Sequence, residues 1–102
     1  MTITALERLD EFVKRHADAK RPLASWAQIA RGASWQNLQE VHQTLPHADG
    51  VKVASGRVVT VFNVRGNNYR LLTTIDYRVG VVNVLSVMTH AEYDKEKWKQ
   101  TL

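Results

Sequence analysis

The chain has 102 residues, a length that fits one compact domain spanning residues 1–102. Apolar residues make up 44% and charged residues 24%, as in a globular protein, and no window holds the ~18 apolar residues of a membrane-spanning helix. Cysteine is absent, which excludes disulfides and thiolate catalysis. Because the N-terminus also lacks the pattern of a secretory signal, we expect a cytoplasmic protein with no membrane contact.

The net charge of +4 arises in the second half of the chain. Residues 1–50 hold six Lys or Arg and six Asp or Glu, whereas residues 51–102 hold eight and four. Such an excess favours polyanionic partners, chiefly nucleic acid, because neutralised phosphates release their counterions. A basic surface that only keeps the protein soluble explains the charge equally well.

The first half of the chain predicts three helices. Thr4–Glu7 has the pattern of a capping box, and apolar residues at helical spacing follow it to about residue 18. Pro22 suits the first turn of a second helix, which Gly32 closes. A third, short helix begins at the box Asn37–Glu40 and ends before Pro46.

From Val51 onward the periodicity changes to the two-residue alternation of strands. Turn residues at Ser55-Gly56, Gly66-Asn67 and Gly80 divide this half into strands at 51–54, 57–65, 68–77 and 81–89. The strands form an antiparallel meander, and a short C-terminal helical segment anchored by Trp98 follows them. The sequence therefore predicts an α+β fold, with N-terminal helices packed on one face of a small twisted sheet.

The predicted turns determine which side chains share a face of the sheet. A two-residue turn at Gly66-Asn67 places Asn63 opposite Arg70. A three-residue turn ending at Gly80 places Arg70 opposite Met88, one same-face step from His90. We expect these polar side chains on a helix-free face. The other face collects the core residues Phe62, Val64, Tyr69, Leu71, Ile75, Leu85 and Val87.

Arginine, histidine and tyrosine are the side chains that cleave RNA without a metal ion. The 2′-hydroxyl attacks the neighbouring phosphorus, so the protein must remove one proton, supply another and stabilise the added negative charge. Arg70 suits the charge because its planar guanidinium stays ionised and donates bidentate hydrogen bonds. His90 suits the proton transfers because histidine changes its charge near neutral pH. We expect both side chains to act without supporting the fold, although each alone is more often an ordinary surface residue.

Further polar residues are candidates for RNA contacts. Asparagine amides can bind a phosphate or a base edge, and basic side chains attract phosphates. Asn67 is not among them because the turn explains it. No histidines and carboxylates have the spacing of a metal site, so we expect neither a metal ion nor a cofactor. The candidates for RNA binding are Asn63, Arg65, Asn68, Lys95, Lys97 and Lys99.

Two phrases of the sequence resemble the hallmark sequences of a known family. Val61–Leu71 (VFNVRGNNYRL) and Thr89–Asp94 (THAEYD), closed by Trp98, are similar to segments of HigB-type toxins, a branch of the RelE-like superfamily. The similarity extends to Pro22-Leu23 and Trp26, to Trp35, and to Leu45-Pro46 with Ala48-Asp49, and so covers nearly the whole chain.

The resemblance implies the toxin of a type II toxin–antitoxin system with a RelE-like fold. Such a toxin is a small basic endoribonuclease that needs no metal, cuts mRNA, typically on the translating ribosome, and is held inactive by a helix-turn-helix antitoxin of the HigA type. Carried over residue by residue, it adds Tyr93 to the catalytic candidates and Asp94 to the RNA-binding ones. The matching positions are Asn63, Arg70, His90, Tyr93 and Asp94, with Lys97 as a basic neighbour.

Two other classes of function remain open from the sequence. A non-catalytic regulator would bind RNA or the ribosome through the same basic face and leave the RNA intact. A structural interaction module, whose charge is incidental, would bind RNA weakly and lose it at moderate salt.

Overall fold

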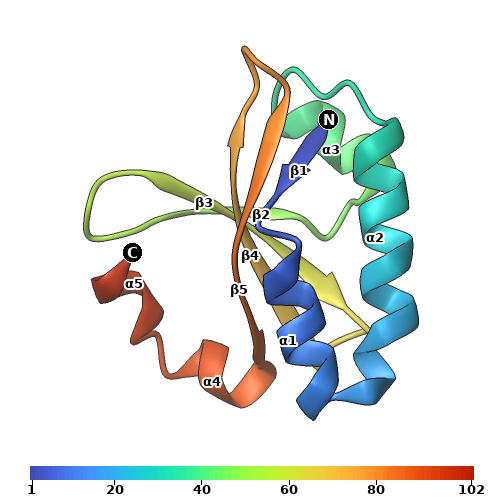
Figure 1. Cartoon of the computed structure of the whole chain (residues 1–102). Coiled ribbons are helices and arrows are strands. Elements are labelled where there is room, and N and C mark those ends of the chain that lie inside the picture. Colours follow the sequence, from blue (N-terminus) through green and yellow to red (C-terminus); the bar gives the residue numbers. More distant parts are fainter.

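A computed structural model describes residues 1–102 as a five-stranded sheet with helices on both faces (Figure 1). Strands β2 to β5 form the predicted antiparallel meander. The additional strand β1 pairs in parallel with β5, so the sheet is mixed and the prediction of a purely antiparallel sheet is wrong at this edge. In the order β1-β5-β4-β3-β2, the strands are β1 (Thr2–Thr4), β5 (Val81–Thr89), β4 (Tyr69–Asp76), β3 (Val58–Val64) and β2 (Asp49–Lys52).

The N-terminal helices cover one face of the sheet, on the right in Figure 1. They are α1 (Glu7–Arg15), α2 (Lys20–Gly32) and α3 (Leu38–Thr44), with a 3₁₀ turn, η1 (Ala17–Ala19), between the first two. None of the helices has the length and apolar character needed to cross a bilayer. The short helices α4 (His90–Asp94) and α5 (Trp98–Thr101) form the predicted C-terminal segment.

Of the two predicted capping boxes in the first half, one forms its N-cap hydrogen bond, although its Glu40 carboxylate accepts from the backbone N–H of Gln36 and not from that of Asn37. The side chain of Asn37 accepts a hydrogen bond of 3.0 Å from the backbone N–H of Glu40 and begins α3. Thr4 instead belongs to β1, where its hydroxyl donates to the side chain of Asn83 at 2.7 Å, and α1 begins without a side-chain cap. Sheet pairing holds Thr4 extended, and the left-handed φ of 62° at Ala5 separates the strand from the helix.

The larger hydrophobic core lies between the N-terminal helices and the sheet. It contains 18 buried residues and includes the predicted face of β3 and β4. The rings of Trp26 and Trp35 flank Phe62 at centroid distances of 5.4 and 6.3 Å. Trp26 is therefore a core residue of α2 and is not available to stack on a nucleobase.

A smaller core lies on the opposite face of the sheet, where no helix was expected. Its five buried residues are Val53, Val59, Val61, Leu72 and Trp98. Helices α4 and α5 approach the sheet from this side, on the lower left in Figure 1. The expectation of a helix-free face is therefore wrong, because Trp98 packs the C-terminal segment onto it.

A β-bulge in β5 changes which side chains face each core. Val84 pairs with Thr73 and Ser86 pairs with Leu72, so Leu85 has no residue directly opposite it. An extra residue in one strand reverses the alternation of faces beyond it. Leu85 consequently packs against the smaller core, although the sequence predicted it in the larger one.

The bulge also explains why the predicted register is correct at Arg70. Asp76, not Tyr77, pairs with Val81, so the β4–β5 turn is one residue longer than predicted. The carboxylate of Asp76 accepts hydrogen bonds from two backbone N–H groups of this turn. The extra residue of the bulge compensates for the longer turn, and Arg70 lies opposite Met88 as predicted.

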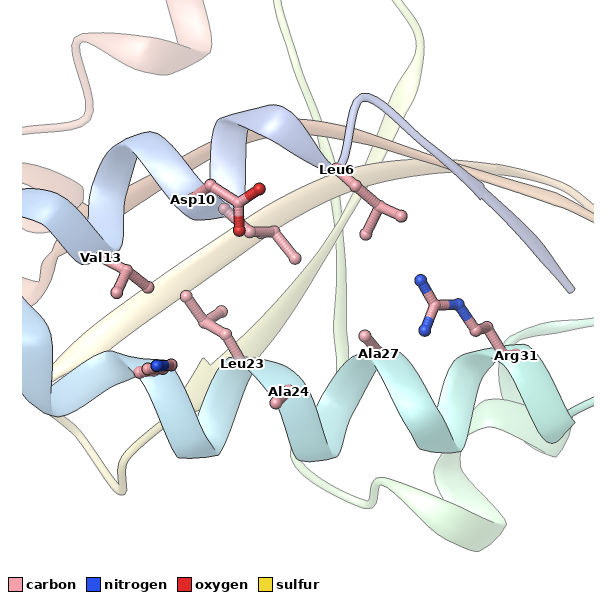
Figure 2. Close-up of a pocket in the computed structure, with 9 residues that line it drawn as sticks. Leu6, Asp10, Val13, Leu23, Ala24, Ala27 and Arg31 are labelled. Carbon is pink, nitrogen blue, oxygen red and sulfur yellow. The ribbon is translucent and has the colours of Figure 1, made fainter.

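Helices α1 and α2 run side by side and leave a groove between them (Figure 2). Its volume is about 530 Å³, and Asp10, Lys20 and Arg31 lie among its apolar lining residues. The groove contains no histidine or tyrosine and none of the residues predicted to act on RNA. The apolar lining consists of Leu6, Leu9, Val13, Leu23, Ala24 and Ala27.

Arg8 binds the backbone at the bulge, and its removal should weaken the fold. Its Nη1 atom donates to the carbonyls of Val84 and Leu85 at 3.0 and 2.9 Å. Because Arg8 is exposed, we expect Arg8→Met to lower the free energy of unfolding by only about 1 kcal/mol in urea denaturation. Arg15→Met, at the end of the same helix, is the control. Equal losses for both variants would mean that the bonds to the bulge contribute nothing.

Candidate active site

Arg70 lies at the start of β4, buried beneath the β3–β4 hairpin. Only 9% of its surface is exposed. Its Nη1 atom donates to the backbone carbonyls of Asn67 and Tyr69 at 3.2 and 3.1 Å, and Nη2 lies 3.3 Å from Nδ1 of His90. A buried charge is tolerated only with such partners. The expectation that Arg70 does not support the fold is therefore wrong.

The hairpin tip has a different conformation from the one that the Gly-Asn pair predicts. Asn63 pairs with Arg70 as predicted, and the N–H of Asn68 donates to the carbonyl of Arg65 at 3.2 Å. The left-handed residues are Arg65 (φ 52°) and Gly66 (φ 62°), and Asn67 is not one of them. Positive φ therefore does not explain the asparagine at position 67.

His90 is the first residue of α4, and a capping box fixes where that helix begins. The hydroxyl of Thr89 accepts from the N–H of Glu92 at 3.2 Å, and the Glu92 carboxylate accepts from the N–H of Thr89 at 3.2 Å. The backbone N–H of His90 also donates to the carbonyl of Asn68 at 3.0 Å, which ties α4 to the hairpin. The Thr-x-x-Glu pattern of the sequence predicts this cap, in addition to being part of a family phrase.

Asp94 follows His90 by one helical turn and contacts its ring. Asp94 Oδ2 lies 2.9 Å from His90 Nε2, and both side chains are more than half exposed. Because a guanidinium can only donate, Nδ1 of His90 accepts from Arg70, so in the neutral ring Nε2 carries the proton and donates to Asp94. Asp94, predicted to bind RNA, thus holds the orientation and tautomer of the imidazole together with Arg70.

Tyr93 is stacked between Arg70 and Trp98. The Arg70 guanidinium carbon lies 5.5 Å from the centre of the Tyr93 ring, and the Trp98 ring lies 5.0 Å away on an almost parallel plane. The indole N–H of Trp98 donates to the Tyr93 carbonyl at 3.0 Å. Burial raises the pKa of the Tyr93 hydroxyl, and the negative charge of Asp49 adds to this effect. The hydroxyl therefore stays protonated at neutral pH, so it is suited to donate a hydrogen bond and not to act as a base.

The two asparagines predicted to bind RNA lie in separate hollows beside the hairpin tip. Asn63 is exposed in a hollow of about 320 Å³ that it shares with His47, Gly66 and Asn67. Asn68 lines a second, shallow hollow of about 530 Å³ that includes His90. The structure thus brings Asn68 to the histidine and leaves Asn63 on the far side of the tip.

The basic candidates divide into free and paired side chains. Lys95 and Lys97 are exposed, make no ion pair, and line a hollow of about 270 Å³ beside Trp98. Lys99 instead bonds Glu96 at 2.8 Å, and this hydrogen bond raises the pKa of Lys99. Arg65 likewise pairs with a carboxylate, that of Asp18, at 3.4 Å.

An aromatic group that the sequence did not predict lies at the end of α1. The ring of His16 stacks on Phe12 at 4.4 Å and lies 5.4 Å from the ring of Tyr69. The Tyr69 hydroxyl donates to the Asp18 carboxylate, and this hydrogen bond raises the pKa of Tyr69. Phe12 and His16 are four residues apart, a spacing that predicts contact on a helix. Only the tertiary structure places His16 in the same hollow as His90.

The structure contains no cluster of three or more histidines and carboxylates that could hold a metal ion.

Comparison with known families gives one match. Residues 19–96 match the family HigB_toxin, described as the RelE-like toxic component of a toxin-antitoxin system. The matched segment includes the hairpin and α4, with Arg70, His90, Tyr93 and Asp94, whereas His16 and Lys97 lie outside it. No curated protein matches the chain.

Substitution of Arg70 should cost stability as well as activity. We expect Arg70→Ala to lower the free energy of unfolding by about 2 kcal/mol, because two hairpin carbonyls and a ring nitrogen lose their donor. Arg70→Lys should lose less stability than Arg70→Ala, because an ammonium keeps the positive charge. It should still be less stable than the parent, because an ammonium cannot reproduce the planar fork of the guanidinium. The control is Arg78→Ala, whose side chain is 91% exposed. If denaturant titration gives the same loss for Arg70→Ala and Arg78→Ala, the hydrogen bonds of Arg70 do not stabilise the hairpin.

Proposed function

The chain belongs to the HigB family of RelE-like toxins, and from this premise we propose that it is an endoribonuclease that cleaves mRNA on the translating ribosome. As the toxin of a toxin–antitoxin system it has an antitoxin partner, which we propose is a helix-turn-helix protein of the HigA type. Its place of action is then the cytoplasm. The observation that carries this proposal is the line of hydrogen bonds from Asp94 through His90 to Arg70.

His90 is the proposed base in this reaction. When a substrate phosphate takes over the Nη2 donor of Arg70, Nδ1 of His90 is released while Nε2–H remains bonded to Asp94. The free Nδ1 then accepts the proton of the 2′-hydroxyl, as a base oriented by a carboxylate does in other enzymes. The 2′-oxygen bonds to phosphorus, the bond to the 5′-oxygen breaks, and that oxygen takes up a proton. The products are a 2′,3′-cyclic phosphate and a 5′-hydroxyl.

Arg70 and Tyr93 supply the remaining requirements. The guanidinium of Arg70 stays charged and is held in place by the two hairpin carbonyls, so it needs little reorganisation to stabilise the phosphorane. The Tyr93 hydroxyl, whose pKa is raised by burial, keeps its proton and is suited to donate a hydrogen bond to a phosphate oxygen or to the leaving 5′-oxygen, which takes its proton from water. Neither role requires a metal ion or a cofactor.

The contacts that hold the RNA come from both sides of this centre. Lys95 and Lys97 lie next to α4 with no carboxylate paired to them, so they are the proposed phosphate contacts. Lys99 and Arg65 can bind an RNA phosphate only by giving up their present carboxylate partners, so we propose that they contribute less to RNA binding. The amides of the two hairpin asparagines, Asn63 and Asn68, are the proposed contacts to base edges or sugar.

The decisive experiment combines induced expression with mapping of RNA ends. The parent should arrest growth and cut ribosome-bound mRNA, also after chelation of metals under conditions that leave ribosomes intact. A substrate with a 2′-deoxy nucleotide at the scissile position should not be cut. His90→Ala should lower the cleavage rate by ~10²–10⁴-fold and relieve the arrest. It should stay folded and keep its binding to the antitoxin, with a melting temperature lowered less than that of Arg70→Ala, because Arg70 loses only one of its acceptors. His42→Ala, on α3, is the matched control.

Each contrary result has a specific meaning. A folded His90→Ala variant that still cuts RNA would show that the site is wrong. Normal cutting of the 2′-deoxy substrate, or loss of cutting on chelation alone, would disprove the mechanism. A parent that binds mRNA or ribosomes and leaves the RNA intact would be a non-catalytic regulator.

The salt dependence of RNA binding tests the assignment of the lysines. Each phosphate contact contributes about 0.7 to the slope of log affinity against log salt for a single strand. We expect Lys95→Gln and Lys97→Gln each to reduce the slope by about that amount, whereas Lys99→Gln, whose ammonium is already paired with Glu96, should change it less. Equal slopes for all three variants would place the phosphate contacts elsewhere.

A further inference from the structure

We propose that the hollow between the end of α1 and the hairpin tip binds one nucleobase of a single-stranded RNA next to the scissile phosphate, and that His16 positions this base by stacking. The inference rests on the proposed function, because it places a substrate contact beside His90. It adds to the centre of Arg70, His90, Tyr93 and Asp94 a residue that lies outside the segment matched to the family.

The composition of the hollow favours a base over a phosphate. The hollow is shallow and open to solvent, with a volume of about 530 Å³, and none of its lining residues is a lysine, arginine, aspartate or glutamate. Amides and imidazoles offer both donors and acceptors, which suits the edge of a base, whereas a phosphate requires positive charge. Its lining residues are His16, Asn67, Asn68, Tyr69, Thr89, His90 and Ala91.

His16 is held rigidly enough to act as a stacking platform. One face of its ring lies on Phe12 at 4.4 Å with the planes 23° apart, and the side chain remains partly exposed. The adjoining turn is tied to the hairpin through Asp18, which accepts from the Tyr69 hydroxyl and pairs with Arg65. The residue thus reaches the hollow already ordered, so stacking of a base on it costs little further side-chain entropy.

The histidines of the protein differ in what occupies their rings. His42 Nε2 lies 2.6 Å from the carbonyl of Ala48, and both ring nitrogens of His90 contact other side chains. The ring of His16 makes aromatic contacts alone. It is therefore free to receive a ligand, and it shares its hollow with the histidine assigned to proton transfer.

The test is binding of short single-stranded RNA that carries a 2′-deoxy nucleotide at the scissile position, so that it cannot be cut. His16→Ala should weaken binding by about 10-fold, at the lower end of measured base-stacking contributions. His16→Phe keeps an aromatic face and should restore most of the affinity. His42→Ala should bind as the parent does. Melting temperatures of all variants establish that they are folded.

Binding of abasic substrates separates stacking by His16 from a purely structural role of this residue, because a structural role would not make the affinity depend on the presence of one base. Removing the base at one position next to the scissile phosphate should weaken binding to the parent by about the same factor, and should weaken binding to His16→Ala hardly at all. In cleavage assays His16→Ala should raise KM with kcat nearly unchanged, because stacking acts equally on ground and transition states.

The outcomes separate this inference from the proposed function. If the parent cuts RNA and folded His16→Ala matches it in affinity, KM and response to abasic substrates, the subsite is disproved and the endoribonuclease proposal stands. If His16→Phe binds as weakly as His16→Ala, stacking is disproved. If the parent cuts no RNA, the proposed function fails, and this inference, which rests on it, fails with it. Should His16→Ala not fold, the abasic comparison between the parent and His16→Phe decides, because both should respond equally.

Discussion

Burial of the Arg70 guanidinium is the constraint around which the rest of the site is built. The charge cannot be removed by deprotonation, so every donor that leaves water needs an acceptor inside the protein. The acceptors are two carbonyls of the β3–β4 hairpin and the ring of His90, and the Tyr93 ring covers the guanidinium. These groups belong to the hairpin and to α4, which the hydrogen bond from the His90 N–H to the Asn68 carbonyl also joins. In the proposed reaction, the side chain that these contacts hold in place also supplies the positive charge that stabilises the phosphorane.

The bulge in β5 makes this arrangement possible. Because the β4–β5 turn is longer than a simple hairpin requires, the pairing near the turn would carry Arg70 away from Met88, and the extra residue at Leu85 compensates. Leu85 then joins the smaller core, which holds Trp98 and with it the C-terminal segment. Trp98 in turn stacks on Tyr93. A local irregularity of the sheet thus has consequences for both the register at Arg70 and the helices that carry His90 and Tyr93.

The polar groups around Arg70 differ in charge from one side of the proposed site to the other. Free lysines lie on the side of α5, the hydrogen-bonded line of Asp94, His90 and Arg70 lies at the centre, and a hollow without charged side chains lies on the side of α1. This spatial arrangement suits a strand of RNA that is held by its phosphates on one side and by a base on the other. The groove between α1 and α2, with its mostly apolar lining (Figure 2), contains none of these groups.

The sequence by itself determined the α+β class, the meander, the pairing of Asn63 with Arg70 and the family, because alternation, turn residues and family phrases are local signals. Tertiary structure decided what local signals leave open. The pattern Thr-x-x-Glu occurs at Thr4 and Thr89, and it caps a helix only at Thr89, because sheet pairing holds Thr4 in β1. The bulge, the burial of Arg70 and the approach of His16 to His90 likewise depend on residues far apart in the chain. Their contacts form only when the helices pack on the sheet, so no local pattern could have predicted them.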